Sequence, residues 1–240
     1  NINLELNLQR NSIDNPLYTR KGSQFMFSVA ATPPWSLWDG KDYKNMSDQD
    51  EAKFRMIEYH KWKFKAKIFS PLAPLTVKRT PVLMTRVEYG FLGSYNKYKK
   101  SPFETFYMGG DGMSGYSSTY ATETIGLRGY ENGSIAGNGG YNSYGYAYSR
   151  LSMELRYPFL LEPSSTIYGL VFVEAGNAWR DLKDFNPFQL KRSAGVGVRI
   201  FLPMIGLMGI DWAYGFDEAN YGSGGKRSGS NFHFIIGQEF

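Results

Sequence analysis

The sequence contains no cysteine and no long run of hydrophobic residues. Without cysteine, the chain can form no disulfide scaffold, no thiolate metal site and no cysteine nucleophile. No stretch approaches the ~20 apolar residues that a membrane-spanning helix needs, and the mean hydropathy is −0.39. This absence excludes a helical membrane protein. It leaves a transmembrane β-barrel open, because barrel strands carry their apolar residues at every second position.

Residues suited to catalysis or metal binding are also sparse. The two histidines, His60 and His233, lie far apart without ligand spacing, so we expect both to be ordinary strand residues. The glycine pairs at 109–110 and 139–140 lack the strand–loop–helix context of a phosphate site, and no Gly-x-Ser-x-Gly elbow occurs. The sequence therefore predicts no catalytic residue, no metal site and no cofactor.

The net charge is +5, but one group of lysines follows a strand pattern rather than a surface patch, which argues against a nucleic-acid partner. This lysine row comprises Lys61, Lys63, Lys65 and Lys67. It alternates with Trp62, Phe64, Ala66 and Ile68. A strand places the lysines on one face, whereas a helix would scatter them. In a soluble sandwich the row would face solvent, and in a membrane barrel it would line the aqueous lumen.

Alternation with a period of two recurs along the chain and predicts an all-β protein of about nine strands. The expected strands cover residues 2–9, 23–31, 61–68, 80–92, 144–157, 165–176, 192–202, 207–216 and 230–240. Between them we expect a polar loop at 33–50, a short helix near 48–56 and a turn at 158–164. Aromatic residues are frequent at 17% of the chain.

The connections between these strands differ in length in a regular way. In order they are medium, long, short, very long, short, long, very short and long, which is the asymmetry of an outer-membrane barrel with short periplasmic turns. Bacterial single-chain barrels have an even number of strands, and open edges are not tolerated in lipid. Nine strands therefore indicate either missed strands or, as we favour, a portion of a larger transmembrane antiparallel β-barrel. The chain opens on a strand rather than a signal peptide, which is typical of a mature or truncated boundary.

The longest connection, 94–143, is rich in glycine and tyrosine and shows no strand or helix pattern. A loop of this length in a compact domain is expected to be functional. It holds Arg128 between Gly126 and Gly129, and an arginine at membrane depth requires a partner. Our candidate is Glu174, on the inward face of a later strand. A solvated loop arginine and a solvated lumen carboxylate fit the pattern equally well.

Several segments, in a consistent order from 103 to 240, carry a resemblance to a known family. They are Phe103–Gly110, Leu127–Tyr130, Val171–Trp179, Ser193–Gly197, Pro203–Leu207, Asp211–Phe216 and Phe232–Phe240. The second is similar to the (V/I/L)-R-G-(F/Y) loop motif of the BamA superfamily of outer-membrane assembly and translocation barrels. The third resembles that family's strand ending in an acidic residue, glycine and tryptophan, and the last resembles its terminal assembly signal.

The resemblance implies that residues 1–240 are the C-terminal portion of a barrel of about 16 strands. The loop 94–143 would then be extracellular and fold into the lumen through the motif residues Gly126, Leu127, Arg128, Gly129 and Tyr130. Their arginine would pair with a wall residue that is usually aspartate and here is Glu174. The first and last strands would meet at a weak seam, the lateral gate, with Gly237 as kink glycine and Phe240 at the end. Periplasmic POTRA domains and the early strands would precede this chain.

The implied function is the insertion of β-barrel proteins into the bacterial outer membrane by strand templating, without covalent catalysis. The implied partners are nascent outer-membrane proteins, accessory subunits of an assembly complex, outer-membrane lipid and lipopolysaccharide. A TamA-like or two-partner-secretion barrel is the alternative within the superfamily. Outside it, a passive porin would use the lysine row for anion selectivity, and an outer-membrane hydrolase is a weaker option.

Overall fold

The computed structural model describes residues 2–47, 50–112, 123–135, 144–162, 164–204, 206–219 and 226–236. Nine strands form one antiparallel sheet: β1 (Leu4–Asn11), β2 (Gly22–Ala31), β3 (His60–Pro71), β4 (Val82–Gly93), β7 (Ala147–Glu162), β8 (Ser165–Trp179), β9 (Lys191–Leu202), β10 (Gly206–Ala219) and β11 (Lys226–Ile236). Each pairs with the next in this order. The predicted all-β class and the nine strands are confirmed.

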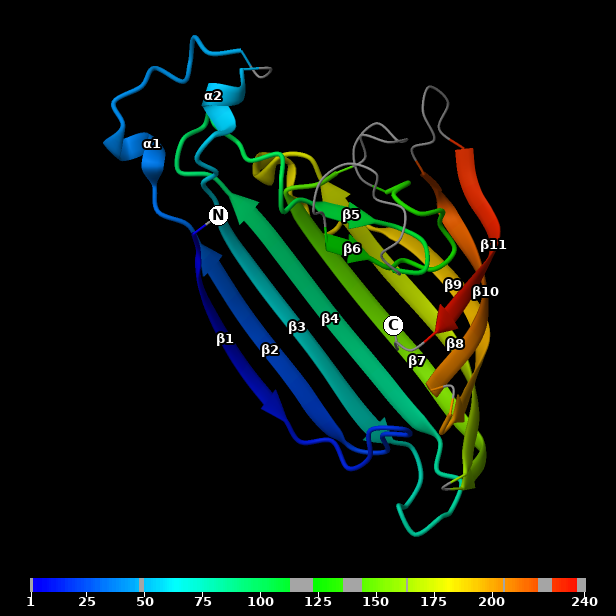
Figure 1. Ribbon diagram of the computed structural model, residues 1–240. Coiled ribbons are helices and arrows are strands. Elements are labelled where there is room, and N and C mark those ends of the chain that lie inside the picture. The colour runs from blue at the N-terminus through cyan, green and yellow to red at the C-terminus, as the bar shows by residue number, and fades with distance from the viewer. Residues whose placement is uncertain are drawn as a thin grey trace.

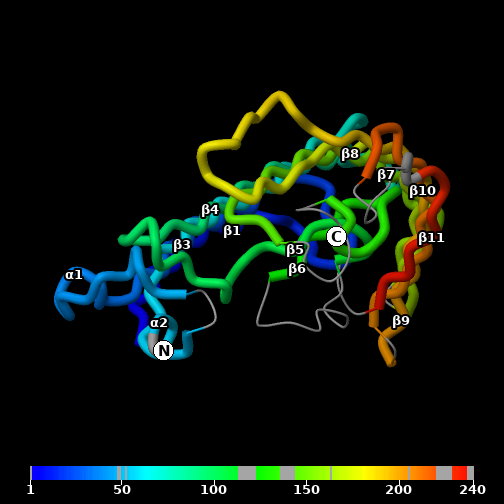
Figure 2. The backbone as a smooth tube through the Cα atoms, turned by 90° about the horizontal axis from the view of Figure 1, so that it is seen from above, coloured from blue at the N-terminus to red at the C-terminus, as the bar shows by residue number. Residues whose placement is uncertain are grey.

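The sheet is strongly curved, and one connection lies on its concave side (Figures 1 and 2). This β4–β7 connection includes β5 (Phe106–Met108) and β6 (Glu123–Ile125), which pair in parallel. The sequence predicted no strand here, because three-residue strands are too short to show a period. Both pack over the concave face together with Leu127 and Tyr130.

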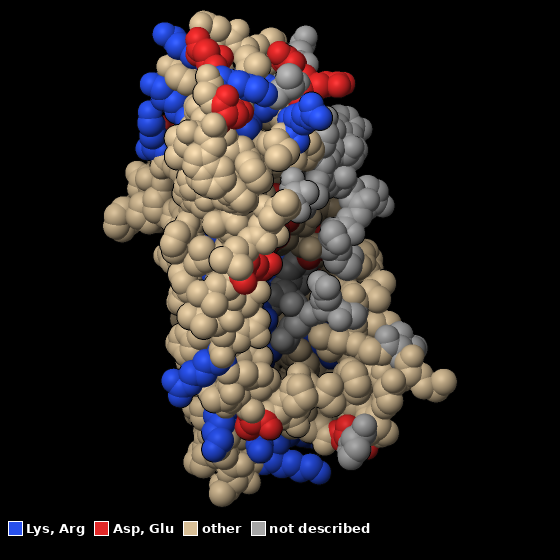
Figure 3. All heavy atoms as spheres, turned by 60° about the vertical axis from the view of Figure 1, so that its left-hand side comes forward, with Lys and Arg blue, Asp and Glu red and all other residues tan. Residues whose placement is uncertain are grey.

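Alternating side chains divide the sheet into a polar concave face and an apolar convex face. The convex face carries a row in which each residue is the register partner of the next: Leu155, Val171, Val196, Trp212 and Phe232. These side chains are 40% to 67% exposed. Figure 3 shows charged residues gathered at the two ends of the molecule, with a mostly uncharged surface between them. Such a belt is typical of a lipid-facing barrel wall.

The β2–β3, β4–β7 and β8–β9 connections lie at one end of the sheet, and the β7–β8 and β9–β10 turns lie at the other, as the sequence predicted (Figure 1). The β10–β11 connection was predicted to be long but is short, because β10 continues to Ala219 and β11 begins at Lys226. The β2–β3 connection contains the short helices α1 (Trp35–Trp38) and α2 (Glu51–Phe54), and the β8–β9 connection contains η2 (Leu182–Asp184). α2 was expected, whereas α1 falls in a segment predicted to be loop. No helix in the described part of the chain is long and apolar enough to cross a membrane.

The turn predicted at 158–164 begins too early, because β7 continues to Glu162 and its antiparallel partner β8 begins at Ser165. A register shift between Pro158 and Leu160 marks a bulge, where a proline is accommodated within a sheet although it lacks a backbone donor. Pro158 was therefore the misleading signal.

Candidate functional site

The loop motif Gly126–Tyr130 directly follows β6 and is held against the concave face. Leu127 is fully buried and donates its N–H to the carbonyl of Gly110 at 3.1 Å. Gly129 has a φ of +87°, and a Cβ there would lie 2.9 Å from Ser193 Cβ and 3.0 Å from the nitrogen of Gly215. Glycine is therefore required at 129 both by its backbone conformation and by the close approach to β9 and β10.

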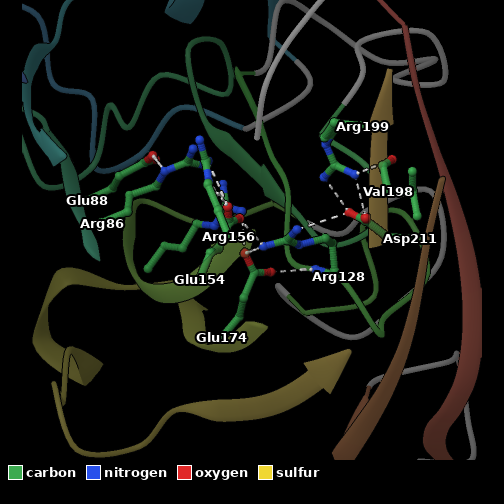
Figure 4. Close-up of polar contacts among 10 residues, drawn as sticks. Arg86, Glu88, Arg128, Glu154, Arg156, Glu174, Val198, Arg199 and Asp211 are labelled. Carbon is green, nitrogen blue, oxygen red and sulfur yellow. Dashed lines mark hydrogen bonds and ion pairs between the residues drawn. The ribbon is translucent and has the colours of Figure 1, made fainter. Parts of the chain in front are cut away.

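Arg128 lies at the centre of a buried ionic group on the concave face (Figure 4). Its Nη2 donates to Glu154 Oε1 at 2.6 Å and to Glu174 Oε1 at 2.7 Å, and its Nη1 donates to Asp211 Oδ2 at 3.0 Å. The backbone N–H of Arg128 donates to Glu174 Oε2 at 2.9 Å. Strands β7, β8 and β10 thus each supply one carboxylate to the same arginine.

Each of these carboxylates also binds an arginine of the sheet. Glu174 accepts from Arg150 at 2.8 Å, Glu154 from Arg156 at 2.7 Å, and Asp211 from Arg199 at 2.6 Å. We call the seven residues the arginine cluster: Arg128, Arg150, Arg156, Arg199, Glu154, Glu174 and Asp211. Its sheet members form three neutral pairs, and Arg128 adds one positive charge shared among three carboxylates. The sheet members of the cluster are therefore charge-balanced without Arg128, whereas buried Arg128 is paired only when the loop is in place.

Small residues on the concave face make room for this cluster. The guanidinium of Arg128 lies 3.5 Å from the centre of the Phe172 ring, so the ring supplies a cation–π surface as well as packing. A Cβ at Gly195 would collide with that ring, and a Cβ at Gly197 would collide with Asp211. The glycines on the inward face of β9 therefore leave space for the residues that contact Arg128.

The motif also contacts the last strand of the sheet. Gly129 donates its N–H to His233 Nε2 at 2.9 Å, and its carbonyl accepts from Asn231 Nδ2 at 3.1 Å. The Tyr130 hydroxyl donates to the carbonyl of Arg192 on β9 at 2.7 Å. Arg128, Gly129 and Tyr130 together thus reach five consecutive strands, β7 to β11.

The lysine row, on β3 and therefore away from strands β7 to β11, contacts the same β4–β7 connection. Glu123 of β6 lies 3.2 Å from the Nζ atoms of Lys61 and Lys63 and 3.5 Å from that of Lys65, and Glu104 lies 3.3 Å from Lys61. Burial raises the pKa of Glu123, but the lysines outweigh it, so the pKa is lowered overall. Lys67 shares their face of β3. The sequence did not indicate Glu104 or Glu123, because nothing in a loop sequence specifies which strand it will meet.

The other predicted site residues lie as follows. Gly126 is buried beside the cluster, whereas Gly237 and Phe240 lie outside the described residues. His60 and His233 are on β3 and β11, and within the described ranges no group of three or more histidine or carboxylate side chains is placed to hold a metal ion.

Besides Glu104 and Glu123, the sequence reasoning missed three residues that contact the loop motif. Alternation places Glu154 and Asp211 on the inward faces of their strands. An inward-facing carboxylate was therefore the feature that could have identified them as partners of Arg128. His233 was treated as an ordinary strand residue, and its contact with Gly129 had no signal in the sequence.

Comparisons with known proteins agree with this architecture. The family model described as the Omp85 superfamily domain matches residues 1–240. Among 58 matching chains of solved structures, one is BamA from Haemophilus ducreyi lacking POTRA domains 1–3, with a TM-score of 0.64 and 19% sequence identity. The match covers 97% of this chain and 41% of that one, so this chain has the fold of part of a BamA barrel. A search of curated protein sequences found no match. Because the family model spans the whole chain, the chain belongs to the Omp85 superfamily.

Proposed function

We propose that this chain is the C-terminal portion of a barrel that inserts other β-barrel proteins into the bacterial outer membrane. The observation that carries the proposal is the seated loop motif, which joins five strands and binds the edge strand β11 directly. Membership of the Omp85 superfamily supports it. The step is non-covalent, and the proposed partners are nascent outer-membrane proteins, accessory subunits and lipopolysaccharide.

The apolar convex face supports a location in the outer membrane. An exposed row from Leu155 to Phe232 across five strands would be a liability in water, but in lipid it is the expected surface. The short connections would then lie on the periplasmic side and the long ones outside the cell. This orientation places the β4–β7 connection outside, from where it folds back into the lumen.

We place strand templating at β11, the last strand of the sheet. β11 pairs with β10, and in the complete barrel its other edge would meet the first strand at the proposed lateral gate. An unpaired edge offers backbone donors and acceptors to an incoming strand, which is β-augmentation. The contacts of Asn231 and His233 with Gly129 give β11 a fixed position from which such pairing can begin.

The lysine row favours this reading over an anion-selective porin. Lys61, Lys63 and Lys65 share two loop carboxylates, Glu104 and Glu123, so part of their charge holds the loop rather than being offered to permeating anions. A translocation barrel of the same superfamily is the second candidate, because a loop seated in the lumen would also serve to close a secretion pore.

Photo-crosslinking in cells tests the proposal on the full-length protein. A photoreactive amino acid replaces Phe232 on the edge strand β11, and in a matched control it replaces Val171 on the interior strand β8. Both side chains are exposed on the convex face. We expect crosslinks to nascent barrel proteins from position 232 and few from 171, with loss of outer-membrane proteins on depletion. Normal levels of barrel proteins after depletion, with one secreted substrate trapped instead, would support translocation and contradict the proposal.

A further inference from the structure

A second candidate site lies at the end of the molecule that carries the long connections, apart from the arginine cluster. It is a cavity of about 1000 Å³ lined by residues from 43–47, 53–54, 97–103, 144–146 and 180–184. None of its lining residues belongs to the arginine cluster or the lysine row. Its volume is at the upper end of the range of small-molecule sites.

Aromatic rings and cations line this cavity together. The aromatic residues are Tyr43, Phe54, Tyr98, Phe103, Tyr144 and Tyr146. The cationic residues are Lys44, Lys53, Lys97, Lys100 and Arg180, against two acidic residues, Asp181 and Asp184. The lining therefore carries a net charge of +3. Four of the six rings are tyrosines, which present both an apolar face and a hydroxyl group.

Several of these groups are held in place by contacts within the lining. Lys100 Nζ pairs with Asp181 at 2.8 Å and lies 5.6 Å from the Tyr146 ring centre, and the guanidinium of Arg180 lies 5.5 Å from the Tyr144 ring centre. Tyr43 is 3% exposed and donates its hydroxyl proton to Asp39. The cavity is thus a preformed arrangement, with less to order on binding than a set of loose surface lysines.

The buried cation Lys99 contacts Tyr43, one of the lining residues of the cavity. Its side chain is 2% exposed, and its Nζ lies 3.8 Å from Glu58, 3.4 Å from the Tyr43 hydroxyl and 4.7 Å from the Tyr43 ring centre. Glu58 in turn accepts from the backbone N–H and the hydroxyl of Ser36 at 2.7 and 2.6 Å. These contacts join the β2–β3 connection to the segment after β4 and set the position of the Tyr43 ring.

We propose that this cavity binds an anionic saccharide, with a phosphate or carboxylate group at the cations and sugar rings against the tyrosines. Charged groups bind such anions through strong hydrogen bonds, and the aromatic faces cover the apolar side of a sugar ring. A compact ligand suits a concave site of this size better than a flat protein surface does. The inference rests on the proposed function only in placing the cavity outside the cell. There, the saccharide could come from lipopolysaccharide or from free oligosaccharide.

Calorimetry with the full-length protein in detergent tests this. The probes are a phosphorylated lipopolysaccharide core oligosaccharide, the same oligosaccharide after phosphate removal, and intact lipopolysaccharide. We expect the phosphorylated oligosaccharide to bind, and the dephosphorylated one to bind at least roughly tenfold more weakly. If intact lipopolysaccharide binds and the free phosphorylated oligosaccharide does not, the ligand is the lipid-anchored saccharide. If the two bind with equal affinity, the lipid anchor is not recognised and the free oligosaccharide is a sufficient ligand.

Two double variants test whether the cations of the cavity are responsible for binding. The double variant Lys97→Gln/Arg180→Gln removes two exposed cations of the cavity, and Lys21→Gln/Lys78→Gln removes two exposed cations at the opposite end. We expect roughly tenfold or greater loss of affinity in the first and none in the second. Absence of binding by every probe, or equal losses in both variants, would overturn the proposal. A protein that binds the oligosaccharide but fails to insert barrel proteins would contradict the proposed function alone.

Discussion

Glu174 holds Arg128 by two separate groups: its Oε1 accepts from the guanidinium at 2.7 Å, and its Oε2 accepts from the backbone N–H at 2.9 Å. The family resemblance implied an aspartate at this position, and glutamate is one methylene longer. The extra length does not separate the pair. The two oxygens instead hold both the side chain and the backbone of Arg128, which fixes the loop more firmly than a single ion pair.

Arg128→Ala is expected to release the β4–β7 connection while the sheet stays folded. The three carboxylates keep their sheet arginines, so the loss falls on loop docking, at about 1.5–3 kcal/mol for each lost hydrogen bond to a charged group. Limited proteolysis near residue 128 measures the release, and heat-dependent gel mobility reports on the barrel. Arg55→Ala, at an exposed position, is the control. A loop that stays protected in Arg128→Ala would contradict the assigned contacts.

Glu174→Gln and Glu174→Asp separate the effect of the negative charge at this position from the effect of side-chain length. The amide variant leaves Arg128 and Arg150 without their shared counter-charge and should weaken docking by about 3–5 kcal/mol. The aspartate variant keeps the charge but cannot serve both the guanidinium and the backbone N–H, so we expect a smaller loss of about 1–3 kcal/mol. Protease protection of the loop at increasing denaturant concentration ranks the variants. Equal losses in both would show that charge plays no separate part.

His233→Ala and Asn231→Ala are expected to loosen β11 from the loop. Each leaves one buried backbone group of Gly129 without its partner, at a cost of about 1–3 kcal/mol. Hydrogen exchange at the backbone amides of β11 should accelerate, while exchange in β8 should not change. Phe232→Ala is the control, because that side chain points outward and is 67% exposed. Faster exchange in the control as well would indicate general weakening of the edge rather than a specific contact.

The attachment of Glu123 to the lysine row should depend on pH in a defined direction. Because the pKa of Glu123 is lowered in the folded protein, its ion pairs contribute stability above the ordinary carboxylate pKa. That stability is lost only as the pH falls through the lowered value. A spin label near β6 should therefore stay immobile between about pH 7 and pH 5 and become mobile only in stronger acid. Glu123→Gln should be mobile throughout, with Lys78→Gln as the unaffected control. Release of the label in unmodified protein at pH 5 would refute this.

Much of the sheet could be predicted because a strand with one buried face has a period of two in its sequence. The inward positions of Arg150, Glu154 and Arg156 on β7 follow from that period alone. Strand ends were less accurate, as at Pro158, because proline signals a turn even where a bulge accommodates it. The short strands of the β4–β7 connection had too few residues to show any period.

The sequence by itself determined the alternating strands, the lengths of most of their connections and the candidate pair of Arg128 and Glu174. Only the tertiary structure brought Glu154 and Asp211 to the same arginine, Glu123 to the lysine row, and His233 to Gly129. The physical reason is that alternation specifies which face a residue occupies. How far the sheet curves, and where a loop enters its concave side, depends on contacts between segments more than 80 residues apart, such as Arg128 with Asp211.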